Sequence, residues 1–461
     1  MSNKISPKVY AAIIATGLMS FCGVIVETSM NITFPTLMRE YNLATNTVQW
    51  MTSIYLLVVS IVVPLSAILK SSFKIRHLFM TANLLFLLGL AIDAVAPAFP
   101  FLLLGRAIQG VGTGIALPLM FNIILEQVPQ SKVGTMMGIG NMITGIAPAI
   151  GPTFGGLIVS KIGWRWIFYL LIPLIIISLL LGLWGIQQKA PVIKQRLDII
   201  SFLAIAFLFS GFIYGFSNLS GNAFFSMKVA GAIGIGIVAM IVLVWRSAHL
   251  SVPILNLSLL KHHVFGSHVL ALFLIQMMSL GNAFLLPNYI QLVNHNSALL
   301  AGLLVLPAGV VGAIMSPVGG QLLDRHGARL PIITGSSVMV VVLALFALLS
   351  RKLNNGLIVV IYSFYMGAMG MTMASTMTDA LNNLTDRENA QGNAIINTCQ
   401  QFAGAMGTSI VSAIVALSQH TAGSKAALPT AIGTQHAYML LTIFSVLIWV
   451  ALATSTKKKN G

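Results

Sequence analysis

The sequence predicts an all-α polytopic membrane protein with fourteen spanning helices, and three observations support this fold class. The chain has 461 residues, of which 57% are hydrophobic and 7% are charged, whereas a soluble protein carries about 25% charged residues. Its apolar segments are continuous rather than alternating, which excludes a transmembrane β-barrel. Its Lys and Arg residues concentrate in alternate loops between these segments.

The apolar segments follow one another with short loops between them. A spanning helix needs about 20 apolar residues. This template fits fourteen stretches of the chain, at residues 10–38, 47–68, 77–97, 99–124, 134–160, 165–187, 198–218, 226–246, 263–292, 298–322, 330–350, 355–380, 389–417 and 432–453. The pair within 198–246 has the least support, because deleting it would leave twelve helices and the same topology elsewhere.

The basic residues predict the topology. With the N-terminus in the cytoplasm, seventeen Lys and Arg residues fall on the cytoplasmic side, seven fall on the outer side, and Arg106 lies inside a helix. This bias follows the positive-inside rule and places both termini in the cytoplasm. The net charge of +16 therefore belongs to the loops that orient the chain, and we expect no nucleic-acid partner.

The chain also contains a weak internal repeat, offset by eight helices. The stretch from Glu126 to Gly134 and the stretch from Asp386 to Gly392 each lead into a Gly-rich helix, and the loop at 70–76 matches the loop at 324–329. We therefore expect two six-helix halves, residues 1–190 and 261–461, with a helix pair at 191–260 inserted between them. Parallel repeats of this kind are typical of a transporter whose site lies between the halves.

One carboxylate, Glu27, lies deep inside an apolar segment. It is seventeen residues into the stretch 10–38 and about 16 Å from the outer end of that stretch, at 1.5 Å per residue. The other eight acidic residues fall at or near segment ends or between segments. A charge near the bilayer centre costs roughly 2.5–3.5 kcal/mol, so Glu27 is expected to be functional. The alternative is a structural acid paired with a nearby base.

Two further residues are expected at a similar depth. Arg106 lies about 10 Å, and Tyr55 about 12 Å, from the outer end of its own segment. All three side chains could therefore face one cavity. Burial and a nearby guanidinium act on the proton affinity of a carboxylate in opposite directions, and proton coupling requires such a balance. The alternative for Arg106 is a structural tie to backbone carbonyl groups.

The second half offers neutral polar residues within its apolar segments. His268 is the single His well inside a segment, and such a residue is more often a hydrogen-bonded core side chain than a proton relay. The amides could line a cavity or join helices by hydrogen bonds, which is their commoner use; they are Gln276, Asn282, Asn288, Asn397, Gln400 and Gln401. No nucleotide-binding loop, metal cluster or nucleophilic triad occurs in the loops, so we expect no enzyme activity, cofactor or metal.

A Gly/Pro-rich motif occupies the fifth segment. Small residues on one helix face allow close approach of another backbone, and an internal Pro removes a hydrogen bond and bends the helix. Such a helix could form a rocking contact between the halves, or it could be ordinary small-residue packing. The residues that form the motif are Gly145, Gly151, Pro152, Gly155 and Gly156.

Several of these motifs resemble one known family. The run Gly145–Gly156 resembles the antiporter motif of the major facilitator superfamily. The run Gly105-Arg106-Ala-Ile-Gln109-Gly110-Val-Gly112 resembles the family's second conserved motif, whose Arg is implicated in proton coupling. The first segment, Glu27-Thr-Ser-Met-Asn31-Ile-Thr-Phe-Pro35, resembles the corresponding motif of the fourteen-helix drug:proton antiporters. The stretch 301–327, with Asp324 and Arg325, is also similar to that subfamily.

The resemblance implies proton-coupled efflux of hydrophobic, cationic compounds by a monomer in a bacterial plasma membrane. It implies a proton-coupling and substrate site that includes Glu27, Arg106, Asn31 and Tyr55, to which the amides of Gln400 and Gln401 would contribute from the second half. The alternatives are an exporter of a lipid, a neutral antibiotic or a metabolite, and a non-transporting membrane sensor on the same fold.

Three motifs depart from the family pattern. Glu27 stands where the subfamily usually has Asp, and Lys70 and Phe73 stand where the first loop motif has Asp and Gly. Cys399 precedes Gln400 where the family has Arg before Gln. With these departures and no second deep carboxylate expected, proton coupling would depend almost entirely on Glu27.

Overall fold

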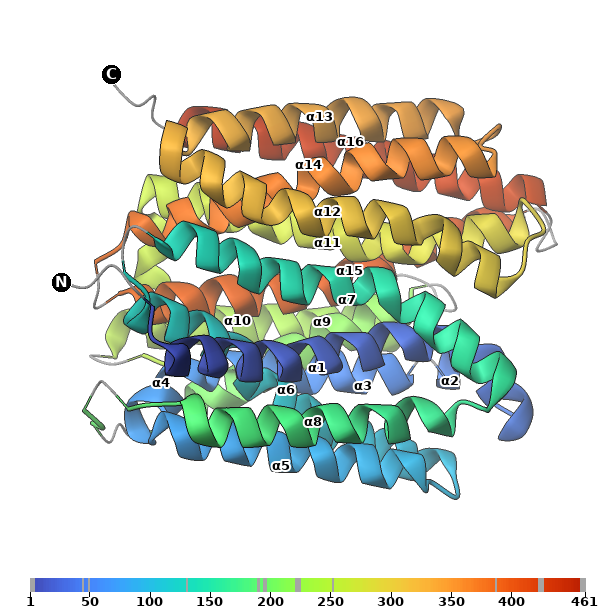
Figure 1. Cartoon of the computed structure of the whole chain (residues 1–461). Helices are drawn as coiled ribbons and strands as arrows, with labels where there is room; N and C mark the ends of the chain where they lie inside the picture. The colour runs from blue at the N-terminus through green and yellow to red at the C-terminus, as the bar shows by residue number, and fades with distance from the viewer. Residues whose placement is uncertain are drawn as a thin grey trace. The chain divides into compact units, whose positions relative to one another are not determined.

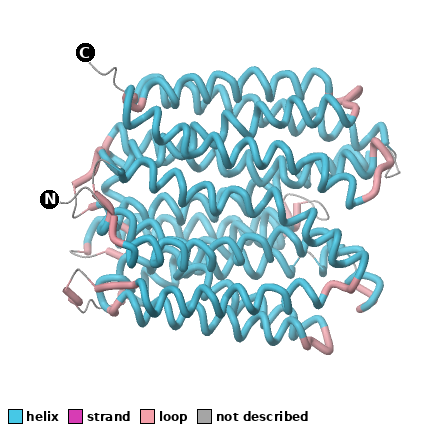
Figure 2. The backbone as a smooth tube through the Cα atoms, in the orientation of Figure 1, coloured by secondary structure: helices cyan, strands magenta, loops and turns pink. Residues whose placement is uncertain are grey.

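The computed structural model describes residues 5–43, 45–48, 50–129, 132–188, 191–193, 197–219, 225–250, 253–385, 388–421 and 427–456. These residues form helices and loops without strands (Figure 2). By contacts, the chain divides into two compact units, Met1–Leu197 and Asp198–Gly461. We describe each unit by itself. The division of the chain at residues 190 and 260 stays a prediction.

The first unit contains eight α-helices and one short 3₁₀ turn among its described residues. Within it, α1 packs against both α7 and α8, and α5 packs against α6 (Figure 1). The elements are α1 (Pro7–Glu40), α2 (Thr45–Val48), α3 (Trp50–Val62), η1 (Val63–Leu65), α4 (Ser66–Ser72), α5 (Ile75–Ala94), α6 (Phe99–Gln127), α7 (Val133–Lys161) and α8 (Arg165–Gly185).

The second unit contains the remaining helices. Its α9 packs against α15, where the rings of Phe209 and Phe402 have centroids 5.1 Å apart. The elements are α9 (Ile199–Ser217), η3 (Met227–Gly231), α10 (Ala232–His249), η4 (Leu257–Lys261), α11 (His263–Leu292), α12 (Ala298–His326), α13 (Arg329–Leu349), α14 (Asn355–Asn382), α15 (Asn389–Thr421) and α16 (Ala427–Ser455).

The described helices confirm the predicted fold class. Thirteen of them are long and apolar enough to cross a membrane. The remaining expected segment, 47–68, corresponds to α3, η1 and α4, which continue one another with a 3₁₀ turn at Val63–Leu65. Pro64 lies in this turn and lacks the N–H that an unbroken α-helix would use, which accounts for the interruption.

Local sequence signals set several helix ends. Ser6 caps α1, where its hydroxyl accepts a hydrogen bond from the Val9 amide at 3.4 Å, and Pro7 begins the helix. Asn354 caps α14 in the same way at the Leu357 amide. Gly327 ends α12 with a φ of 83°, a conformation that favours glycine.

Candidate functional site

Glu27 lies in the middle of α1 and is buried, with 9% of its surface exposed. No hydrogen bond, and no ion pair within 4.0 Å, joins its carboxylate to any described residue. Arg106 nevertheless acts on it electrostatically from α6. A buried carboxylate normally has hydrogen-bond partners, and Glu27 has none among the described residues.

Arg106 is fully buried and is held by groups other than Glu27. Its Nε donates to the carbonyl oxygen of Met51 on α3 at 3.2 Å, and its Nη1 donates to Oε1 of Gln109 at 3.0 Å. Its Cζ lies 4.2 Å from the centroid of the Tyr55 ring, which is within cation–π range. Its Nη2 is buried and has no hydrogen-bond partner among the described residues. The expected tie to a backbone carbonyl is therefore present, alongside an unused donor.

Tyr55 joins three helices at one point. Its hydroxyl lies 2.9 Å from both the Gly23 carbonyl oxygen on α1 and Oγ1 of Thr113 on α6. Because a carbonyl only accepts, Tyr55 donates to Gly23 and Thr113 donates to Tyr55. A Cβ at Gly23 would lie 2.8 Å from the Thr113 side chain. Glycine at this position therefore allows α1 and α6 to approach and fixes the ring beneath Arg106.

Asp93 is a functional candidate that the sequence analysis missed. It lies one residue before the end of α5, as expected from its place in the sequence, but it is completely buried. Its Oδ2 accepts from Nε2 of Gln109 at 2.8 Å, and Gln109 in turn accepts from Arg106. Asp93 therefore lies near a helix end, as predicted, but protein side chains enclose it there, which was not predicted.

Burial of Asp93 depends on a close helix contact that a local pattern does not reveal. A Cβ at Gly105 would lie 2.0 Å from Oδ1 of Asp93, and a Cβ at Gly89 would lie 2.5 Å from the Gln109 side chain. The two glycines thus let α5 and α6 enclose the carboxylate. In the sequence, the repeated glycines around Arg106 indicate that another helix packs closely here. They do not show which helix it is.

Apart from ion-paired side chains at helix ends, the described part of the first unit has three buried charged residues, which are Glu27, Asp93 and Arg106. Arg106 interacts electrostatically with both acids. If all three groups are ionised, the cluster has two negative charges and one positive charge. Burial of an uncompensated charge is costly, so the cluster is complementary to one additional positive charge.

The Gly/Pro motif of α7 contacts α1 within the same unit. Ser29 donates to the carbonyl oxygen of Gly151 at 2.9 Å. A Cβ placed at Gly151 would lie 1.9 Å from Oγ1 of Thr28. A Cβ placed at Gly155 would lie 2.7 Å from the Ser29 carbonyl oxygen. A Cβ at Gly145 would meet no heavy atom within 4 Å. The motif thus seats α7 beside the two residues that follow Glu27.

The remaining members of this motif lie on the same helix. Pro152 is half-buried and Gly156 is buried within α7. A role for the motif as a rocking contact between the halves stays a prediction, because the described contacts of Gly151 and Gly155 are with α1.

Comparison with known proteins decides the family. A sequence model described as the Major Facilitator Superfamily matches residues 16–408. The chain belongs to this superfamily. The resemblance carried by the motifs is therefore confirmed at the family level.

Named bacterial relatives cover nearly the whole chain. The lincomycin resistance protein LmrB of Bacillus subtilis (strain 168) is 36% identical over 95% of this chain and 94% of its own length. The protein of the same name from Listeria innocua is 37% identical over 94% of this chain and 91% of its own length. The multidrug resistance protein B homolog of Mycobacterium tuberculosis (strain H37Rv) is 25% identical over 82% of this chain and 71% of its own length.

Solved structures support the same fold. The human organic anion transporter MFSD10 (TETRAN) superposes with a TM-score of 0.67 at 14% identity, covering 97% of this chain and 100% of that one. A D-xylose-proton symporter gives the same TM-score and identity, covering 98% of each chain. At this identity the likeness shows the superfamily fold and not the substrate.

Other predicted superfamily motifs lie outside the buried cluster. Gln400, which is buried, and Gln401, which is half-buried, lie on α15 in the second unit. Asn31 lies on α1, but its side chain is outside the described part of the structure. Asp324 and Arg325 are exposed in the last turn of α12.

The first loop motif, which departs from the superfamily pattern, has its own partner. Lys70 at the end of α4 forms an ion pair with Glu126 at the end of α6. Lys70 therefore joins two helix ends of the first unit.

Proposed function

We propose that this protein is a drug:proton antiporter that exports hydrophobic, cationic compounds. It would act as a monomer in a bacterial plasma membrane, with both termini in the cytoplasm. The observation that carries the proposal is the composition of the buried cluster in the first unit, which contains two carboxyl groups, Glu27 and Asp93, and one guanidinium, Arg106. The superfamily consists of transporters, and the proposal involves no catalytic chemistry and no cofactor.

The charge of the cluster gives a reason for exchange. When both carboxyl groups are ionised, one proton or one monovalent cationic group of a drug balances the cluster, and both together would give it a net positive charge. Each therefore excludes the other by electrostatics. Alternate occupancy by drug and proton is the requirement for antiport, and it predicts one proton for each monovalent drug cation.

Within the cluster, Glu27 is better suited to exchange than Asp93. Asp93 is fully enclosed and accepts a hydrogen bond from Gln109. Glu27 keeps 9% exposure and has no hydrogen-bond partner among the described residues. We therefore assign proton and drug binding to Glu27, while Asp93 and Gln109 would hold the Arg106 guanidinium in place.

The names of the relatives favour drugs over the other substrates considered. Two of them are lincomycin resistance proteins and a third is a multidrug resistance protein homolog. Lincomycin is therefore the first compound to test, followed by lipophilic cations and neutral drugs. Export of a lipid or metabolite, and a non-transporting sensor, have no comparable support.

The test is proton-driven accumulation of lincomycin in inverted membrane vesicles that contain the full-length protein. We expect uptake when an inward-acidic gradient is imposed and loss of uptake when a protonophore dissipates it. The Glu388→Gln variant is the matched control for Glu27→Gln, because it removes a half-buried carboxylate outside the cluster that accepts hydrogen bonds from Thr385. Accumulation that is unaffected by the protonophore would exclude antiport. Absence of accumulation for every class of compound would favour the sensor.

A further inference from the structure

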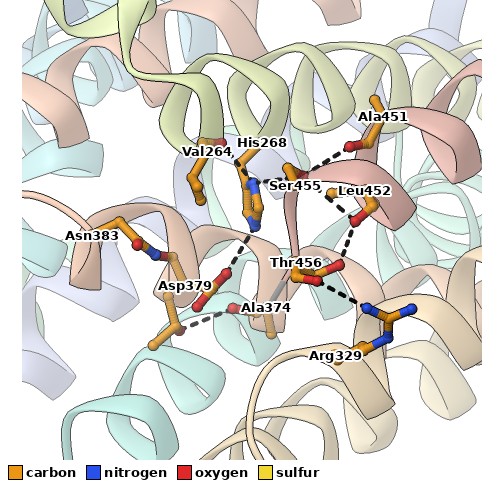
Figure 3. A network of polar contacts seen from close by, with 11 residues as sticks. Val264, His268, Arg329, Ala374, Asp379, Asn383, Ala451, Leu452, Ser455 and Thr456 are labelled. Carbon is orange, nitrogen blue, oxygen red and sulfur yellow. Dashed lines mark hydrogen bonds and ion pairs between the residues drawn. The ribbon is translucent and has the colours of Figure 1, made fainter. Parts of the chain in front are cut away.

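The second unit contains a buried histidine bonded to a carboxylate near one end of its helices. His268 lies near the start of α11 and is completely buried, and Asp379 lies near the end of α14. Nε2 of His268 is 2.9 Å from Oδ2 of Asp379, and Nδ1 is 2.7 Å from the carbonyl oxygen of Val264 (Figure 3). Both ring nitrogens therefore face oxygen atoms.

The two contacts of the imidazole ring need two protons, one on Nδ1 and one between Nε2 and the Asp379 carboxylate. A neutral imidazole beside an ionised carboxylate has only one. A carbonyl oxygen only accepts, so Nδ1 carries a hydrogen and donates to Val264. A neutral imidazole with its hydrogen on Nδ1 would then place the Nε2 lone pair 2.9 Å from the carboxylate oxygen. That contact is attractive only when a proton lies between the two atoms, whether it belongs to His268 or to Asp379.

We propose that His268 and Asp379 form a proton-binding site in the second unit, separate from Glu27. The bound proton ties α11 to α14. Its loss replaces a charge-assisted hydrogen bond with repulsion between a lone pair and a carboxylate, and so weakens the contact between the two helices. The proposal rests on this contact and not on the proposed transport function.

The pair has a route by which the proton can leave. His268 is closed to solvent, whereas 20% of the Asp379 side chain is exposed. Water can therefore reach the carboxylate without entering the helix contact. The proton would pass between the carboxylate and water while Nδ1 of His268 keeps its hydrogen bond to Val264.

Among the described residues, no other titratable side chain bonds to the His268–Asp379 pair. On α16, Ser455 lies 3.5 Å from Nδ1 and donates to the Ala451 carbonyl oxygen at 2.8 Å (Figure 3). Arg329 of α13 donates to the Thr456 carbonyl oxygen at 3.2 Å. None of the described titratable groups at this end of the unit hydrogen bonds to His268 or to the Asp379 carboxylate; these groups are Lys261 to His263, Asp324 to His326, Arg329 and Glu388.

The Asp379→Asn variant keeps the contact without the additional proton. The Asn amide can donate to Nε2 of a neutral His268 while Nδ1 still donates to Val264. This variant therefore serves as the fold-preserving control. His268→Gln removes the imidazole and identifies its signals by their disappearance.

The proton can be located by two spectroscopic readouts on the purified full-length protein in lipid nanodiscs near pH 7. Nitrogen-15 NMR of labelled histidine reports whether Nδ1 and Nε2 of His268 are both protonated, and infrared spectroscopy reports the carbonyl band of a protonated carboxyl group. We expect the wild type to show either a doubly protonated imidazole or a protonated carboxyl group, Asp379→Asn to show neither, and Glu27→Gln to leave the signals unchanged. An imidazole with a single N–H together with an ionised Asp379 would overturn the proposal.

A thermal measurement tests the consequence for helix packing. At pH 7, the midpoint of thermal unfolding should be a few degrees lower for His268→Gln than for the wild type, because the variant removes the imidazole that contacts Asp379. Equal midpoints for the two proteins would show that this contact does not stabilise the packing of α11 on α14.

Discussion

Each of the two units contains a buried basic residue that interacts with an acid, but the two units hold the acid in different ways. In the first unit, Glu27 has no hydrogen bond to a described residue, and Arg106 is bound instead to Met51 and Gln109. In the second unit, Asp379 contacts His268 directly at 2.9 Å. The first arrangement leaves a carboxylate available to a ligand that comes and goes, whereas the second couples a proton to the packing of two helices.

The difference also concerns what each base does for the fold. Arg106 compensates the charge of two acids and bonds to the backbone of α3, so its loss should damage both stability and function. His268 contacts a single carboxylate, and that carboxylate is partly exposed, so the loss of His268 should cost less. Substitutions in the two clusters can therefore separate structural from functional effects.

The largest expected effect is that of Arg106→Leu. It leaves Asp93 and Glu27 buried without a compensating charge, and removing one partner of a buried charge pair costs about 3–5 kcal/mol. We expect a strongly lowered midpoint in thermal unfolding of the purified protein. His268→Gln should cost about 1–3 kcal/mol, the range for a buried polar group that loses its partner.

A double variant sharpens this contrast. Arg106→Gln combined with Asp93→Asn makes the pair neutral, keeps hydrogen-bonding side chains, and should recover most of the lost stability without recovering proton coupling. An Arg106→Leu variant as stable as the wild type would show that Arg106 does not compensate the charge of the buried acids. The proposed difference between Arg106 and His268 would then be wrong.

An intermediate effect is expected at the contact that seats α7 beside Glu27. An Ala at Gly151 would place its Cβ 1.9 Å from Oγ1 of Thr28, and overpacking of this kind typically costs about 1–3 kcal/mol. Gly145→Ala on the same helix is the matched control, because its Cβ would meet nothing within 4 Å. We expect thermal unfolding to show a loss of stability for Gly151→Ala alone. Equal stability of the two variants would show that the motif does not seat α7 on α1.

The smallest effect is expected at a third pair, which lies at a helix end. Hydrogen bonds from the Arg246 guanidinium, together with those from Ser201, lower the pKa of Asp198 to about 2. The pair therefore stabilises the fold above the unfolded pKa of about 3.9, and this contribution is lost as the pH falls from about 4 to about 2. Its size at pH 7 should be on the order of 1 kcal/mol, given partial exposure.

Thermal unfolding of the wild type and of Arg246→Gln at pH 7 and at pH 3 measures this contribution. The difference between the two proteins should be smaller at pH 3. A difference that stayed the same at both pH values would show that Asp198 is not the partner that responds to pH.

Hydrophobicity and loop charge were sufficient to predict the fold class. The membrane cost of Glu27 and the lengths of the apolar runs are properties of single segments, so they can be seen in the sequence. The 3₁₀ turn at Val63–Leu65 was not predicted, because the stretch 47–68 is one continuous apolar segment in the sequence. Pro64 was the local signal for an interruption.

The site was predicted less completely, because its partners are far apart in the sequence. Asp93 was placed near a segment end, and its burial follows from glycines on two different helices. His268 was expected to be a bonded core residue, and it is bonded, but its partner Asp379 is 111 residues away. Pairings of this kind depend on packing between helices, which periodicity and depth do not determine.

The central claim is that Glu27 carries the exchanged proton. The most direct measurement is the change in lumenal pH when drug is added to energised inverted vesicles, compared for the wild type, Glu27→Gln and the Glu388→Gln control. We expect drug-evoked proton release by the wild type and the control, and a loss of at least tenfold in Glu27→Gln, in which an amide cannot take up the proton (a tenfold change corresponds to about 1.4 kcal/mol). Undiminished proton release by Glu27→Gln would show that Glu27 is structural and would contradict the mechanism.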